Sequence, residues 1–209
     1  MRIAQIEKRL PAYEPVLLDL EGNRHAAVAM ILRPAPAGPH VLFIQRSRND
    51  SDPWSGQMAF PGGMVETWDA SAKAAAERET LEEVGIDLTA TAFVGRLDDV
   101  QGRHRNHRGG IIVSGFVYID HHGQTAVPNY EVADIVWEPL ATFTDRRRRC
   151  SVEYPAAPGE RFPGIRVGTT GRQVVWGLTR RFMMSFLEVA GEAPAAGSAA
   201  SQQPEKETD

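Results

Sequence analysis

The stretch that decides the fold is residues 60–86, FPGGMVETWDASAKAAAERETLEEVGI. It opens with a proline–glycine–glycine turn at 61–63 and runs through a short acidic segment into alanines and charged residues, which are strong helix formers. Asp69 and Ser71 carry side chains that accept hydrogen bonds from the free amides at a helix start. Gly85 stands where a helix commonly ends in a left-handed residue. The stretch therefore predicts a glycine turn followed by a helix that stops at Gly85.

Three carboxylates lie within one turn of this predicted helix. Since an α-helix advances about 100° per residue, Glu82 and Glu83 lie roughly 60° and 40° to either side of Glu79. Glu77 points nearly the opposite way, and Leu81 is expected to face the core. Carboxylates at these spacings repel one another, so the cluster is unfavourable unless a cation binds it. Oxygen ligands at this density suit Mg²⁺, with Mn²⁺ as the alternative, and a solvated acidic face is the competing interpretation.

The whole stretch resembles the signature of the Nudix hydrolase family, G-x5-E-x7-R-E-U-x-E-E-x-G-U with U apolar. The positions that match it are Gly63, Arg78, Glu79, Glu82, Glu83, Gly85 and Ile86. Asp69 takes the first acidic position, eight residues separate it from Arg78, and Thr80 takes the first apolar position. The shorter acid with one extra residue is similar to the box of the coenzyme A diphosphatase branch. The resemblance implies an α/β fold, a Nudix-type α/β/α sandwich with a mixed sheet and the acidic helix packed against it.

The site residues follow from the cluster and from this resemblance. The expected metal ligands are Glu79, Glu82 and Glu83, with the Gly63 carbonyl added by the resemblance. Arg78 is expected to orient a glutamate through a paired hydrogen bond, and a surface ion pair is the alternative. The base that activates water is either a glutamate of the box or Glu131, for which a solvated strand-end carboxylate is an equal alternative. Asp69 is expected to act as a helix cap more than as a catalytic group.

The segment upstream of the box, residues 46–63, resembles an additional motif of the coenzyme A diphosphatases. In that motif R-S, a central arginine and G-x3-F-P-G-G recur, and Arg46, Ser47 and residues 56–63 agree with it. The spacing between the two parts is one residue longer here, and Ser-Asp at 51–52 stands in the region of the central arginine. The resemblance therefore identifies a branch of the family better than a substrate.

The implied reaction is Mg²⁺-dependent hydrolysis of the diphosphate bond in a nucleoside diphosphate linked to another moiety, with coenzyme A or a derivative as the first candidate. The same reaction on ADP-ribose, dinucleotides or nucleoside triphosphates is one alternative, and a non-catalytic ligand-sensing domain is another. Residues expected to contact the substrate are Arg46, Arg48, Gly62, Gly63, Arg105 and Arg108. Trp54 is a candidate for stacking on a base, with burial near the turn as the commoner role.

Composition narrows the class of protein. The chain has 209 residues, 42% of them hydrophobic and 24% charged, which is ordinary for one globular domain. A net charge of -4 argues against nucleic acid or an anionic membrane as a partner, despite the arginine run 146–149. The single Cys150 excludes an internal disulfide, and His104 and His107 lack a third zinc ligand. Without an apolar run of 18 or more residues, we expect a cytoplasmic protein with a small-molecule partner, and a homodimer stays open.

The remaining elements are predicted from hydrophobic periodicity. Ile3, Ile6 and Leu10 indicate a short helix over 1–10 that Pro11 ends. Strands are expected over 25–32, 41–45, 92–97, 111–119 and 132–137. A capping box at 170–173 is expected to open a last helix that runs to about 189, with Val175, Leu178, Phe182 and Phe186 on one face. We expect one domain over 1–190 and a disordered tail over 191–209.

Overall fold

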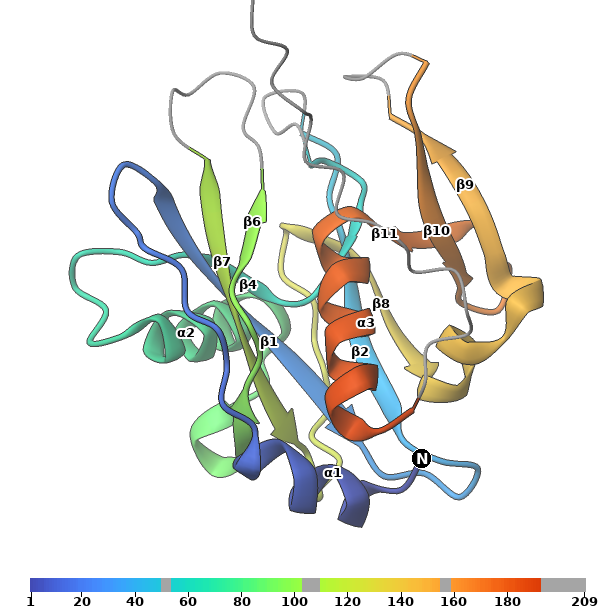
Figure 1. Cartoon of the computed structure of the whole chain (residues 1–209), viewed down its shortest axis with the longest axis horizontal. Helices are drawn as coiled ribbons and strands as arrows, with labels where there is room; N and C mark the ends of the chain where they lie inside the picture. Colours follow the sequence, from blue (N-terminus) through green and yellow to red (C-terminus); the bar gives the residue numbers. More distant parts are fainter. Residues whose placement is uncertain (50–53, 103–109, 155–158, 193–209) are drawn as a thin grey trace, which may run out of the picture.

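The computed structural model describes residues 1–49, 54–102, 110–154 and 159–192. Within them a mixed sheet lies between helices on both faces (Figure 1). Helix α2 (Ala72–Val84) covers one face, and α3 (Gly177–Ala190) with the short α1 (Ile3–Arg9) covers the other. This arrangement confirms the predicted α/β/α sandwich.

Within the described residues, the main sheet has eight strands. Their bounds are β1 Arg24–Arg33, β2 His40–Arg46, β3 Met58–Ala59, β4 Gly62–Met64, β5 Ala92–Arg96, β6 Val100–Gly102, β7 Ile111–Ile119 and β8 Val132–Pro139. The order is β3-β2-β1-β7-β5, while β4 pairs with β1, β6 with β7 and β8 with β2. Strands β1 and β7 are parallel, and the other pairs are antiparallel. All five predicted strands are confirmed to within two residues at either end, whereas β3, β4 and β6 were not predicted.

A second sheet, also not predicted, follows the first along the chain. It has three antiparallel strands, β9 (Arg149–Glu153), β10 (Arg161–Val167) and β11 (Gln173–Trp176), in the order β11-β10-β9. Figure 1 shows it at the edge of the molecule, beside α3. Short 3-10 turns link the elements: η1 Leu10–Ala12, η2 Leu88–Ala90, η3 Leu140–Thr144 and η4 Arg146–Arg148.

The predicted start of the last helix is wrong. The supposed capping box at 170–173 leads into β11, because the β-branched pair Val174–Val175 pairs with β10. Gly177 has a positive φ of 59° and turns the chain directly from β11 into α3. Val175 is therefore buried in a strand, while Phe182 and Phe186 pack on the core as predicted.

The core has two layers because successive strand residues point to opposite faces of the sheet. On β1, Ala27 and Ala29 face α2, whereas Met30 and Leu32 face α3. The layer under α2 contains small side chains such as Ala75, so this helix lies close to β1. The turn of α2 that carries Glu79, Glu82 and Glu83, called the acidic turn below, is thereby held at a fixed place beside β4.

The two ends of the described chain meet. Helix α1 is close to its predicted bounds, and Ile6 is buried against the core. The Met1 amino group lies 2.8 Å from a Glu192 carboxylate oxygen, and Arg9 donates to the Ala190 carbonyl at 3.0 Å. Residues 193–209, most of the predicted tail, lie outside the described residues. None of the described helices combines the length and the hydrophobicity that a membrane span requires.

Candidate functional site

Helix α2 begins and ends as its sequence predicts. The Ser71 hydroxyl accepts a hydrogen bond from the Ala74 amide at 3.1 Å, and Gly85 ends the helix with a φ of 68°. Asp69 is not a cap, and this part of the prediction is wrong. Its carboxylate accepts from the Glu66 amide and from Arg78 instead. Asp69 therefore organises the loop before the helix.

The glycine pair forms a close contact between β1 and α2. Residues 62–64 form strand β4, in which Gly62 lies opposite Val28 on β1. Of the turn predicted at 61–63, only Pro61 lies outside this strand. Gly62 has a φ of 149°, and a Cβ there would overlap the backbone of β1. A Cβ at Gly63 would overlap the carboxylate of Glu79. Both glycines are required if the strand is to lie this close to the acidic turn.

The three glutamates of the acidic turn differ in their surroundings. Glu83 is only 2% exposed, and its Oε2 accepts a hydrogen bond from the Gly62 amide at 2.9 Å. Glu79 is half-buried beside Gly63, whereas the Glu82 side chain is 56% exposed. The acidic turn thus places a buried carboxylate, Glu83, next to β4 (the glycine strand) and an exposed one, Glu82, at the surface.

Arg78 binds the loop and the acidic turn together. Its Nε and Nη2 donate to the two oxygens of Asp69, both at 3.0 Å, and Nη2 also donates to the Met64 carbonyl at 3.2 Å. Its Nη1 donates to Glu79 at 2.8 Å and to Glu82 at 3.3 Å. The predicted paired hydrogen bond is therefore made with Asp69, and each glutamate receives a single bond. This pairing lowers the pKa of Asp69 and raises that of Arg78.

Burial disfavours the charged forms of two of the glutamates. Loss of water raises the pKa of Glu83 to about 7, although the Gly62 amide and the Arg46 charge act against the rise. Burial also raises the pKa of Glu79, against the opposing effect of Arg78. The carboxylate of Glu131 adds to both shifts. Burial, with an addition from the neighbouring carboxylates, therefore disfavours the full negative charge of this site.

The fit to a divalent cation is one of donor chemistry. Among the residues that the structure describes, no three acidic, His or Cys side chains are arranged to hold a metal ion together. Arg78 already bonds to two of the three glutamates. The donors are nevertheless all oxygens. Burial disfavours the charged forms of Glu79 and Glu83, and the absence of a side chain at Gly63 leaves room for the Glu79 carboxylate. This set suits Mg²⁺ or Mn²⁺ and does not suit zinc.

Glu131 lies beside the acidic turn. The segment before β8 is hydrogen-bonded to the last turn of α2, because the Asn129 amide donates to the Glu83 carbonyl at 2.9 Å. The Ser47 amide donates to the Glu131 carbonyl at 2.7 Å. The Glu131 side chain is exposed, and its charge reaches Glu79 and Glu83. The structure thus brings this distant carboxylate toward the box.

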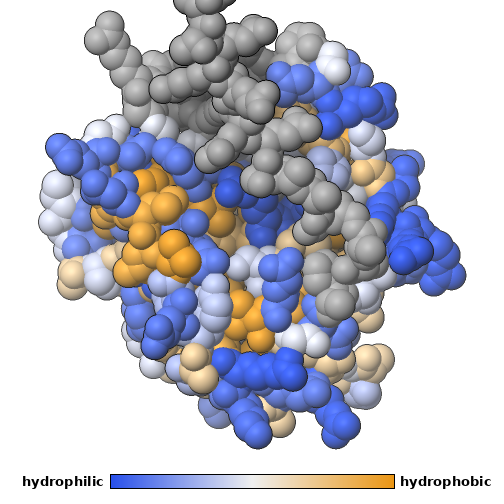
Figure 2. Space-filling view, viewed as in Figure 1, coloured by the Kyte–Doolittle hydropathy of each residue, from blue (hydrophilic) through white to orange (hydrophobic). Residues whose placement is uncertain are grey.

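The predicted phosphate contacts are only partly gathered. Arg46, Gly62 and Gly63 line one cavity, whereas Arg48 is exposed and lines no part of it. Arg105 and Arg108, like His104 and His107, lie outside the described residues. The run 146–149 forms η4 and the start of β9, on the side of the molecule away from α2, where the surface is hydrophilic (Figure 2).

The prediction that Leu81 faces the core is wrong. Leu81 is 51% exposed, and Thr80 is fully buried in its place. The Thr80 hydroxyl donates to the Ala76 carbonyl at 2.7 Å, which satisfies this polar group inside the core. Thr80 is therefore compatible with the apolar position of the signature. Glu77 points away from the acidic turn as predicted, bonded by Tyr118.

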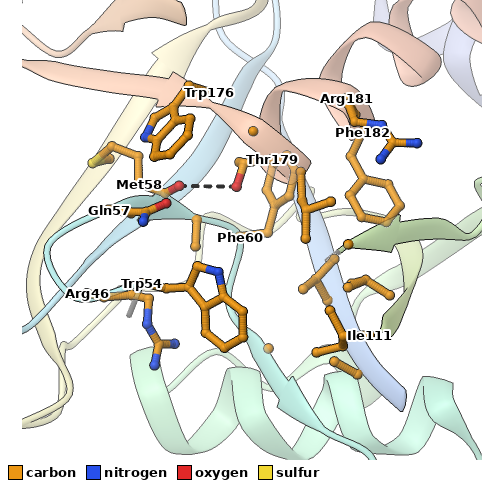
Figure 3. Close-up of a pocket in the computed structure, with 18 of the residues that line it drawn as sticks. Arg46, Trp54, Gln57, Met58, Phe60, Ile111, Trp176, Thr179, Arg181 and Phe182 are labelled. Atoms are coloured by element: carbon orange, nitrogen blue, oxygen red, sulfur yellow. Dashed lines mark hydrogen bonds between the residues drawn. The ribbon is translucent and has the colours of Figure 1, made fainter. Parts of the chain in front are cut away.

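The cavity opens beside the glycine strand and has a volume of about 590 Å³. Its lining includes Trp54, Tyr154, Trp176, Phe60, Phe182 and Met58, which sequence reasoning did not assemble, apart from Trp54 as a stacking candidate. Figure 3 shows Trp54, Trp176 and Phe182 converging from the β2–β3 connection, β11 and α3. Because these elements are distant in sequence, only the clustering of aromatic residues near 154–176 could have indicated the cavity.

Comparison with known proteins places this geometry in a family. The model of the NUDIX domain matches residues 23–155, more than half of the chain. An uncharacterized protein of Schizosaccharomyces pombe, C14C4.10c, is 43% identical over 52% of this chain and 34% of its own length. The uncharacterized Nudix hydrolase NudL of Photorhabdus laumondii is 35% identical over 58% of this chain and 62% of its own length.

The chain thus spans about a third to three fifths of these two relatives. Among solved structures, a MutT/nudix family protein from Enterococcus faecalis superimposes with a TM-score of 0.52 at 16% identity, covering 91% of this chain and 75% of that one. That likeness supports the fold alone. The matched range contains β4, Arg78 and all three glutamates of the acidic turn, and on this ground the chain belongs to the Nudix family.

Proposed function

We propose that the protein is a divalent-metal-dependent hydrolase that cleaves the diphosphate bond of a nucleoside diphosphate linked to another moiety. One observation carries the proposal: Glu83 is buried and Glu79 half-buried against the glycine strand, both with raised pKa values, at the side of a cavity of ligand size. A purely structural helix face keeps its carboxylates solvated, whereas here burial raises the pKa of both groups despite the neighbouring charges of Arg78 and Arg46.

The acidic turn would hold the metal. The ligands are Glu79, Glu82, Glu83 and the Gly63 carbonyl, with Mg²⁺ as the expected ion and Mn²⁺ as the alternative. When bound, such an ion neutralises phosphate charge and acidifies a bound water. Arg78 keeps the acidic turn and the preceding loop in register through its bonds to Asp69 and the Met64 carbonyl. The proton of the attacking water passes to a box glutamate or to Glu131, whose carboxylate is exposed next to them.

Arg46 and the strand Gly62–Gly63 are positioned to receive the diphosphate. They line the cavity on the side of the acidic turn, and the Arg46 charge acts on Glu83. Arg48, Arg105 and Arg108 are assigned as outer phosphate contacts. The box and the upstream motif favour coenzyme A or a derivative as the substrate. ADP-ribose, dinucleotides and nucleoside triphosphates are the alternatives, and a non-catalytic sensing domain is disfavoured because all three helix glutamates are present.

A substrate panel tests the proposal. Purified protein with Mg²⁺ or Mn²⁺ is incubated with coenzyme A, ADP-ribose, dinucleoside polyphosphates and nucleoside triphosphates, and products are separated chromatographically. We expect cleavage of a diphosphate bond that EDTA abolishes, and a loss of several orders of magnitude in Glu82→Gln and Glu83→Gln with the fold retained. Full activity in both variants would overturn the metal assignment. Absence of any product with either ion would favour the sensing domain.

A further inference from the structure

Strand β9 is the open edge of the second sheet. Within the described part of the chain it pairs with β10 alone, and Figure 1 shows its other side at the rim of the molecule. An uncovered edge presents amide and carbonyl groups to any strand that can align with it. The residues of this edge, Arg149–Glu153 (RCSVE), therefore decide which strand fits.

Pro163 of β10 shows which backbone groups of β9 point outward. It lies opposite Ser151 in the antiparallel pairing, and a proline has no amide hydrogen to donate. The two residues therefore form a pair of the kind that exchanges no hydrogen bonds, in which the amide and carbonyl of Ser151 point away from β10. Since the two kinds of pair alternate along a strand, the amide and carbonyl of Glu153 also point outward, while those of Cys150 and Val152 bond to β10.

This edge is complementary to a second copy of itself. When two β9 strands run antiparallel about a two-fold axis through Ser151, each Ser151 exchanges a pair of backbone hydrogen bonds with its counterpart. In the same register Arg149 lies opposite Glu153 of the partner subunit, and this happens twice because the axis repeats it. A shift by two residues would place Ser151 opposite a charged residue, and both pairs of opposite charge within the strands would be lost. The charges therefore select one register.

The surroundings of the two charged residues favour this pairing. Burial lowers the pKa of Arg180 on α3, and the positive charge of Arg149 lowers it further, so an acidic group beside Arg149 would be favourable. Glu153 is exposed, and no ion pair in the described part of the chain includes it. Arg161 lies opposite Glu153 on β10 but donates to the Ser151 hydroxyl, at 3.0 Å.

The other face of the edge is apolar. A Cβ at Gly164 would contact Val174, Val152 and Cys150, so these three side chains share a face of the second sheet, and all three are half-buried. In the two-fold register Cys150 lies opposite Val152 of the partner subunit, in a pair whose Cα atoms are about 4.5 Å apart. The half-buried apolar face of one copy would thus continue into that of the other.

We propose that β9 binds a second copy of this chain, antiparallel about Ser151, so that two three-stranded sheets join into one sheet of six strands. The pairing is short, because the Arg149 amide already donates to the Arg146 carbonyl within η4. Small interfaces of this kind are typical of weak, transient complexes, so the dimer should form in a concentration-dependent way. The inference goes beyond the proposed function and does not depend on it.

Sedimentation measurements over a series of protein concentrations test the surface. We expect the wild type to show a monomer–dimer equilibrium. Glu153→Arg sets like charges opposite each other at both ends of the pairing and should raise the dissociation constant about fivefold or more. Combining it with Arg149→Glu exchanges the two charges and should restore the dimer. Glu21→Arg, the matched control, makes the same change of charge at an exposed site away from β9 and should dimerise like the wild type.

Disulfide cross-linking tests the register. Val152→Cys places a thiol opposite the native Cys150 of the partner subunit, at a Cα separation that a disulfide can span, so oxidation should give a covalent dimer. The same substitution in a Cys150→Ser background leaves only diagonal neighbours about 7–8 Å apart, as does the wild type with Cys150 alone, and neither should cross-link efficiently. Circular dichroism verifies the fold of every variant.

Three results would overturn the inference. One is a wild type that stays monomeric at its highest soluble concentration. The second is a dimer that Glu153→Arg does not weaken, since its interface would lie elsewhere. The third is cross-linking of Val152→Cys that proceeds equally well without Cys150, because the register would then be wrong. Hydrolysis of the panel substrates would be unaffected by any of these outcomes, so the proposed activity is tested separately.

Discussion

Replacing the two glycines of β4 by alanine, one at a time, separates an effect on the stability of the fold from an effect on the proposed metal site. At Gly63 the new Cβ would lie within 2.7 Å of both carboxylate oxygens of Glu79. The backbone of Gly63 does not occupy the left-handed region, so alanine fits the local conformation. The carboxylate is the far end of a flexible side chain and can move away. Gly63→Ala should therefore displace a proposed metal ligand and leave the fold almost unchanged.

Gly62→Ala should have the opposite effect. Its φ of 149° is unfavourable for alanine, and the Cβ would overlap the Ala27 carbonyl oxygen and the Val28 Cα. Backbone atoms of a central strand cannot move aside, so we expect a loss of about 2–4 kcal/mol in the free energy of unfolding. The loss for Gly63→Ala should stay below about 1 kcal/mol, which is about 2–4 °C in melting temperature for a chain of this size.

Two assays applied to the same two variants check the pair. Urea unfolding measures stability, and calorimetric titration with Mg²⁺ or Mn²⁺ measures metal affinity. Gly63→Ala should bind the ion at least about tenfold more weakly, in line with the loss of one carboxylate ligand or its orientation. If Gly63→Ala binds the metal ion as tightly as the wild type does, the Glu79 carboxylate does not coordinate the ion beside Gly63, and the geometric reasoning fails.

Further predictions concern charge and the buried polar groups. Asp69→Asn removes the charged partner of Arg78, and we expect turnover to fall about tenfold or more with little change in the binding affinity for substrate, as measured by steady-state kinetics. Glu83 has a folded pKa of about 7 against an ordinary 4.5, so its contribution to apo stability is present below pH 4.5 and is lost as the pH rises through 7. Stabilisation by Mg²⁺ should accordingly be larger at pH 8 than at pH 5.5, and equal shifts in melting temperature would contradict this. Ser114→Ala breaks a buried bond to Asp99 at 2.8 Å and should lower the free energy of unfolding by about 1–3 kcal/mol while metal affinity is unchanged.

What could be predicted from the sequence depended on how local the deciding contacts are. Strands β1 and β7 are continuous apolar runs, and α2 carries its own cap and stop signals, so each was found from its own residues. Strand β9 exposes Arg149, Ser151 and Glu153, and β10 contains a proline, a glycine and two exposed arginines. Neither strand has the long apolar run that marks β1 and β7. They form because they pair with each other and because β10 packs against α3.

The face of α2 that packs on the sheet was predicted wrongly for a related reason. Helical geometry relates the glutamates to one another, but it does not say which face the sheet will cover. The small side chains of Ala75 and Ala76 allow the closest approach to β1, which buries Thr80 and leaves Leu81 outside. The partner of Asp69 was equally beyond local reasoning, because a loop must fold back before it can meet Arg78 nine residues later.

The arrangement around Arg78 explains how three carboxylates can sit together before any cation binds. Its Nη1 supplies positive charge to Glu79 and Glu82, which relieves the repulsion expected of acidic groups at helical spacing. A divalent ion held by the same carboxylates would compete with that single nitrogen. The other two donors of the guanidinium stay bonded to Asp69 and the Met64 carbonyl, so Arg78 would keep its place when the glutamates change partner. Asp69, shorter than the usual glutamate and one residue farther from the box, thus anchors the arginine that neutralises part of this acidic turn, and it would keep that arginine in place if an ion bound the glutamates.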